Sequence, residues 1–142
     1  MIKQADANLL AYPLKIVTKK EDILKDLKYY EPLLAHDGPA MGGAILAALY
    51  ARVGQQEAAY RAFKKSYEPN EVPPFNVLAE TAGGHNPYFA TGAGGMLQAV
   101  MFGLGGLDIT QDGVIQLDGK LPKKWKGMKM TGIGAQEKTF TR

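Results

Sequence analysis

Three small groups of polar residues stand directly before apolar segments of this chain. Lys3 and Gln4 precede residues 5–16, His36 and Asp37 precede residues 39–53, and a run near residue 94 follows His85, Asn86 and Thr91. If the three apolar segments are parallel helices, their N-termini lie at one end and bring these groups together. Helix N-termini carry free amides and partial positive charge, which favour anions and sugar hydroxyls. The order of residues therefore predicts a binding site at that end.

Each candidate also has a simpler structural interpretation. Lys3 could be a solvated charge, and Asp37 could cap the helix that follows it. Glu80 could be a site acid or an exposed loop residue. The chain has two histidines and no ligand pattern around them, so we expect no metal site. Nucleophile-elbow, P-loop and dinucleotide motifs are missing as well, so we expect no cofactor.

The first half of the chain predicts helices of two kinds. Residues 5–16 predict an apolar helix that Pro13 limits, because proline removes a backbone donor. Thr18 and Glu21 fit a capping box before a helix that extends to about Leu34. Its apolar residues fall on one face: Ile23, Leu24, Leu27 and Tyr30. One helix is therefore nearly all apolar and the next is amphipathic.

The same alternation continues along the chain before the pattern changes. Residues 39–53 are apolar all round, which is typical of a buried helix, and Gly54 ends it. Residues 55–67 are amphipathic, and Met96–Leu104 is a second strongly apolar helix after a glycine-rich stretch. Residues 107–117 then predict a hairpin with Asp112-Gly113 in its turn, and residues 125–140 predict strands. The alternation suggests two layers of helices.

Composition excludes some classes of protein. The chain has no cysteine, so disulfides and thiolate metal sites are impossible. No apolar run reaches the roughly 20 residues of a membrane span, and no secretory signal opens the sequence. The compartment, cytoplasmic or periplasmic, is left open. The lysine cluster near the end, Lys123, Lys124, Lys126 and Lys129, fits a solvated face better than a nucleic-acid surface, because no recognition motif accompanies it.

Four segments together resemble glycoside hydrolase family 65, which includes maltose, kojibiose and trehalose phosphorylases and several α-glucoside hydrolases. Residues 3–6 look like its K-Q-A-D segment, and residues 36–41 read H-D-G-P-A-M, where hydrolases carry an acid followed by G-P-A-M. Residues 94–106 resemble its G-G-x-x-Q-A-V-x-x-G-x-G-G run, and residues 121–125 its L-P-x-x-W. The segments follow the family's order and spacing over almost the whole chain.

The resemblance implies a mainly α fold: a partial (α/α)6 barrel followed by the first strands of a C-terminal β-sandwich. Residues 1–106 would be the C-terminal portion of the catalytic barrel, and residues 107–142 a hairpin and the start of the β domain. The family's general acid would lie upstream of the K-Q-A-D segment. This chain alone should therefore be inactive, and its uncovered helix faces should favour self-association.

The resemblance also implies roles for individual residues. Lys3 and Gln4 would bind the glucosyl unit, and Asp37 would be the general base of an inverting hydrolase. The convergence of polar groups adds His36, His85 and Thr91 as substrate-binding candidates. Phosphorylases of the family carry serines where this chain has Gly38 and Pro39, which offer no hydroxyl to a phosphate, so water is the expected nucleophile.

Two other interpretations stay open from the sequence. The chain could be a non-catalytic helical module that associates through its apolar helices, or a fragment of an α-glucoside phosphorylase. The hydrolase would bind an α-glucoside or oligosaccharide in the full-length context, whereas the helical module would bind no sugar. Nothing in the sequence identifies the linkage that is cleaved or the aglycone.

Overall fold

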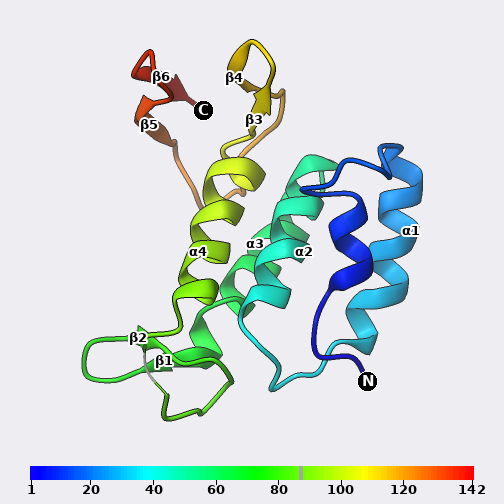
Figure 1. Ribbon diagram of the computed structural model, residues 1–142, viewed down its shortest axis with the longest axis vertical. Helices are drawn as coiled ribbons and strands as arrows, with labels where there is room; N and C mark the ends of the chain where they lie inside the picture. The colour runs from blue at the N-terminus through cyan, green and yellow to red at the C-terminus, as the bar shows by residue number, and fades with distance from the viewer. Residues whose placement is uncertain (87) are drawn as a thin grey trace.

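The computed structural model describes residues 1–86 and 88–142. It is a helical protein with short antiparallel strand pairs (Figure 1). Its helical elements are η1 (Asp6–Leu10), α1 (Lys20–Tyr30), η2 (Glu31–Leu33), α2 (Met41–Arg52), α3 (Gln56–Lys65), η3 (Glu68–Asn70), α4 (Ala90–Gln98) and the π-helical η4 (Ala99–Leu104). Its strands are β1 (Glu71–Val72), β2 (Val77–Leu78), β3 (Leu107–Thr110), β4 (Gly113–Gln116), β5 (Lys129–Ile133) and β6 (Lys138–Thr141).

The buried centre of the molecule is helix α2. Its sequence is almost wholly apolar, and eight of its residues are buried: Gly42, Ala44, Leu46, Ala47, Ala48, Leu49, Tyr50 and Ala51. Helices α1, α3 and α4 surround it (Figure 1). The predicted all-round burial of this helix is confirmed. The helix ends as expected at Gly54, whose φ is +85°, while the Gln55 amide reaches back to the Tyr50 carbonyl.

The helices alternate in direction along the chain. Elements η1, α2 and α4 run one way, and α1 and α3 run the other way (Figure 1). Glycines on α4 and η4 bring this segment close to α2 in parallel register. A Cβ on Gly95 would lie 3.2 Å from the Ala44 Cβ, and one on Gly103 would lie 2.7 Å from the Ala48 Cα. The apolar elements are therefore parallel neighbours.

Three predicted boundaries are wrong. The expected helix over residues 5–16 is only the short 3-10 helix η1, because Pro13 has no amide to continue it and Lys15 takes a left-handed φ of 55°. The expected capping box is not formed: α1 begins at Lys20 after an uncapped Lys19. Helix α4 begins at Ala90, so Thr91 lies in its first turn and does not precede it.

Amphipathic faces follow the sequence pattern more closely. On α1, Ile23 and Leu27 are buried, and on α3 the buried residues are Ala59, Ala62 and Phe63. Helix α1 is shorter than expected, but η2 continues the chain to Leu33. The apolar spacing was therefore a better guide to the buried face than to the last residue of the helix.

The strands form three separate antiparallel pairs. The predicted hairpin is confirmed as β3–β4, with Leu107 opposite Gln116 and Thr110 opposite Gly113, so the turn itself is Gln111-Asp112. The pair β5–β6 confirms strands in the tail, whereas β1–β2 was not predicted. Arg142 joins the tail to the helices by donating to the carbonyls of Leu104 and Leu117. None of the helices in the described residues is long and apolar enough to cross a bilayer.

Candidate functional site

The N-terminal segment is held beside the turn that precedes α2. Ile2 pairs in parallel with Leu34: the Ile2 amide donates to the Leu33 carbonyl at 2.8 Å, and the Ala35 amide donates to the Ile2 carbonyl at 2.9 Å. This pairing sets Lys3 next to the segment that carries His36. A Cβ on Gly38 would lie 3.5 Å from the Lys3 carbonyl oxygen, so the two backbones are close.

The third segment is tied to the same end of the molecule. The amide of Ala40 donates to the Glu80 carbonyl at 3.3 Å, at the start of α2. The Phe89 amide donates to the Leu78 carbonyl at 2.8 Å and so anchors the start of α4 beside β2. The three polar groups of the sequence therefore do stand at one end of parallel helical elements, as the order of residues predicted.

The predicted substrate-binding residues divide between two cavities at this end. A cavity of about 590 Å³ is lined by Lys3 and His36, together with residues of η2 and the facing ends of α2 and α3. A second cavity of about 260 Å³ is lined by Gln4 and Thr91, with Gly42 of α2 shared between the two. Lys3 and Gln4 thus point to different cavities on either side of the α2 N-terminus.

The second cavity is the place where all three helix starts meet. It is lined by η1, by the first turns of α2 and by α4. Leu9, Met41 and Ile45 provide apolar surface, while Gln4, Gln98 and Thr91 can provide neutral hydrogen-bonding groups and Asp6 a carboxylate. Apolar walls with a few polar groups suit a small neutral ligand such as a sugar ring.

Asp37 is exposed in the turn before α2 and lines neither of these cavities. The interpretation of this residue as a helix cap is wrong, because the N-cap of α2 is Ala40 and no side chain caps the helix. The aspartate therefore has no capping role at this helix start. Its role as a base stays a prediction.

The loop before α4 carries the other candidates. The Glu80 side chain is exposed and accepts a hydrogen bond from Asn86 Nδ2 at 3.2 Å. His85 is exposed as well and lines neither cavity. Residues 1–86 and 88–142 hold no cluster of three potential metal ligands.

Two buried polar contacts near the larger cavity escaped the sequence analysis. Asn70 is 2% exposed, lines that cavity, and donates through Nδ2 to the carbonyls of Ala79 and Glu80. The Tyr50 hydroxyl donates to Glu31 Oε2 at 2.5 Å. Burial, and then the hydrogen bond to Glu31, raise the pKa of Tyr50 far above its ordinary value, so this contact persists at neutral pH. No residue pattern could have revealed either contact, because each joins segments that only the fold brings together.

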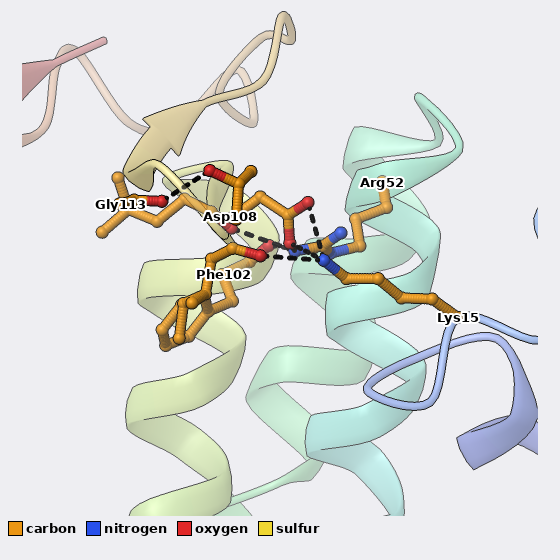
Figure 2. A network of polar contacts seen from close by, with 8 residues as sticks. Lys15, Arg52, Phe102, Asp108 and Gly113 are labelled. Carbon is orange, nitrogen blue, oxygen red and sulfur yellow. Dashed lines mark hydrogen bonds and ion pairs between the residues drawn. The ribbon is translucent and has the colours of Figure 1, made fainter.

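The opposite end of α2 carries a charged network (Figure 2). Arg52 donates to the carbonyls of Phe102 and Leu107 at 3.1 and 3.0 Å and contacts Asp108, which also pairs with Lys15 at 2.8 Å. Burial of Asp108 would raise its pKa, but the hydrogen bonds from Lys15 and Arg52 outweigh burial and hold the pKa below its usual value. This end therefore joins helices to the β3–β4 hairpin.

Comparison with known proteins finds relatives that are named as carbohydrate-cleaving enzymes. No protein-family model matches it. It is 54% identical over 98% of its length to a kojibiose hydrolase of Mucilaginibacter mallensis, and 56% identical over 98% to a kojibiose hydrolase of Flavobacterium johnsoniae. It is 37% identical over 98% of its length to the protein-glucosylgalactosylhydroxylysine glucosidase of Dictyostelium discoideum. The chain spans only about a fifth of these relatives, 21%, 21% and 19% of their lengths, and all three are named as hydrolases or glucosidases.

Proposed function

We propose that this chain is a C-terminal portion of the catalytic region of an inverting α-glucoside hydrolase of glycoside hydrolase family 65. Residues 1–106 would supply the last inner and outer helices of an (α/α)6 barrel, and residues 107–142 the first strands of a β domain. The alternating helix directions support this arrangement, because inner and outer helices of such a barrel run oppositely (Figure 1). The hydrolases that match nearly the whole chain support the activity.

The observation that carries the proposal is the convergence of three helix starts on one cavity. Gln4, Met41 and Thr91 come from three distant segments and line the same space. In the proposed enzyme the glucosyl unit lies at this end of α2, where Gln4 would bind it from this cavity and Lys3 from the neighbouring one. Thr91 and the histidines His36 and His85 would contact other hydroxyls of the substrate.

In the proposed reaction, Asp37 is the general base. It takes a proton from water as the water oxygen forms a bond to the anomeric carbon and the glycosidic C–O bond breaks. An acid from another part of the enzyme protonates the leaving oxygen, and the two carboxyl groups stand roughly 6.5–9.5 Å apart. Gly38 and Pro39 offer no hydroxyl, and Pro39 offers no amide, so the turn provides poor support for phosphate in place of water.

The test measures kojibiose hydrolysis by the longer protein that contains this segment, with Asp37→Asn compared with Asp26→Asn on α1. Removing a general base typically costs about 10²- to 10⁴-fold in rate. We therefore expect Asp37→Asn to lower kcat by that factor and Asp26→Asn to leave it unchanged. Full activity in Asp37→Asn would show that Asp37 is not the general base. An unsubstituted protein that cleaves no α-glucoside would overturn the proposed function.

A helical association module is the second candidate, and exposed apolar side chains favour it. Leu14, Ile16 and Leu97 are 59%, 68% and 59% exposed. Titrating the longer protein with glucose and kojibiose separates the two candidates. A module would bind neither sugar, whereas the hydrolase would bind at least one of them.

A further inference from the structure

Asn70 is a buried polar side chain whose hydrogen bonds reach across to another segment. It ends η3 and is 2% exposed. Its Nδ2 atom donates to the Ala79 carbonyl at 3.2 Å and to the Glu80 carbonyl at 3.0 Å. Buried polar groups need such partners, because leaving them unpaired costs free energy of desolvation. The side chain therefore fixes the chain at residues 79–80.

Backbone bonds reinforce the same junction. The Ala79 amide donates to the Asn70 carbonyl at 2.8 Å, and the Gly83 amide donates to the Pro69 carbonyl at 3.3 Å. Asn70 is itself held close to the end of α3, because its amide donates to the carbonyl of Tyr67, two residues after α3 ends, at 2.8 Å. The position of residues 79–83 is thus set from the end of α3.

The Glu80 carbonyl links this junction to the candidate site. It accepts from Asn70 Nδ2 and also from the amide of Ala40, which is the N-cap of α2 and lies three residues after Asp37. The start of α2 meets the end of α3 directly as well, because a Cβ on Gly43 would lie 3.0 Å from the Ser66 amide nitrogen. One carbonyl therefore ties the turn that carries Asp37 to the loop that leads to α4.

We propose that Asn70 is a positioning residue, which holds the Asp37 turn and the start of α4 in register across the candidate site. The inference rests on the proposed function. Asn70 acts through the Glu80 carbonyl, because its side chain donates to backbone carbonyls and not to the predicted site side chains. A displacement of about 1 Å in a reacting group can cost about 10²-fold in rate, so this indirect role is measurable.

The kinetic test compares Asn70→Ala and Asn70→Asp with Ser66→Ala in the longer protein. Ser66 is a matched control: it is fully buried, and its hydroxyl donates to the Phe63 carbonyl at 2.6 Å, within its own helical segment. Both Asn70 variants remove the amide donor and should lower kcat about 10- to 100-fold with little change in KM. Ser66→Ala should keep kcat within twofold. An Asn70→Ala protein that is folded and keeps its kcat overturns the proposal.

Hydrogen exchange on this chain separates failure of the inference from failure of the proposed function. In Asn70→Ala the amide of Ala40 should exchange faster, because its acceptor is no longer fixed, while the Ala59 amide in α3 should keep its protection. Unchanged exchange at Ala40 overturns the positioning role, whatever the enzyme does. If the unsubstituted longer protein cleaves no α-glucoside, the proposed function fails. Faster exchange at Ala40 in Asn70→Ala would still support the conclusion that Asn70 positions the turn before α2.

Discussion

Arg52 and Asp108 show how a few charged side chains are accommodated at the edge of an apolar core. Their side chains are 14% and 15% exposed, so both need partners. The planar guanidinium of Arg52 meets two carbonyls and a carboxylate, and it also lies 4.2 Å from the centre of the Tyr12 ring. These contacts fix the end of η4 and the start of β3 against α2.

We expect the free energy of unfolding of Asp108→Asn to fall below that of the unsubstituted chain at neutral pH. The pKa of Asp108 in the folded chain lies below its ordinary value of 3.8, so its contribution is present above that value. As pH falls through the lowered pKa, the carboxylate gains a proton and this contribution is lost. Urea unfolding at several pH values should therefore show a gap between the two proteins that closes in acid. A gap that stays constant with pH would contradict the assignment.

At the candidate site, the sequence predicted which end of the molecule carries the polar residues, but not which cavity each side chain lines. The three polar groups do lie at the same end of the molecule, because parallel helices put their starts together, but they divide between two cavities. It did not predict that Lys3 and Gln4 line different cavities, because each cavity forms only where distant segments pack around the start of α2. Asn70 was missed because its partners are backbone carbonyls, which every residue type carries.

At the scale of elements, glycines decide how closely α4 and η4 approach α2. A Cβ on Gly103 would come within 2.7 Å of the Ala48 Cα, whereas one on Gly94 would meet nothing within 4 Å. Gly103 is therefore a packing residue. Gly94 lies in helix α4 with open space around it, so close packing explains Gly103 but not Gly94.

This contrast gives a matched pair of substitutions. Gly103→Ala should lower the free energy of unfolding by about 1–3 kcal/mol, because the neighbouring atom belongs to backbone that resists displacement. Gly94→Ala should raise it by about 0.5–1 kcal/mol, because alanine favours the helix and has open space. Chemical denaturation of both variants checks the signs. Equal destabilisation by the two would show that close packing is not the reason for Gly103.

The elements that could be predicted are those with a strong apolar pattern. Helix α2 and the face of α1 followed directly from the spacing of apolar residues, because burial of that surface stabilises them. The start of α4 was missed because tertiary contacts with α2 outweigh the low helix propensity of Gly92, Gly94 and Gly95. The pair β1–β2 is two residues per strand, too short for alternation to be visible.

At the scale of the whole molecule, the two ends of α2 have different roles. One end is locked by Arg52 and Asp108 to the hairpin, and the other carries the candidate site between three helix starts (Figures 1 and 2). In the proposed barrel, the end that carries Arg52 and Asp108 is the rigid scaffold. The start of α2 then carries loops, which is where functional residues commonly lie. The faces of η1 and α4 that stay open in this chain would meet the other inner helices there.

Those open faces predict self-association of this chain. Leu10 and Leu97 are 41% and 59% exposed, and covering apolar surface yields roughly 25 cal/mol per Å². Sedimentation velocity at increasing concentration should show dimers or larger species, and Leu97→Gln should reduce them. Tyr29→Gln on α1 is the control, because Tyr29 is 67% exposed but lies on a different, amphipathic helix. In the longer protein Leu97→Gln should instead lower the free energy of unfolding, since the remaining helices would cover that side chain. A chain that stays monomeric at every concentration would show that these faces do not drive association.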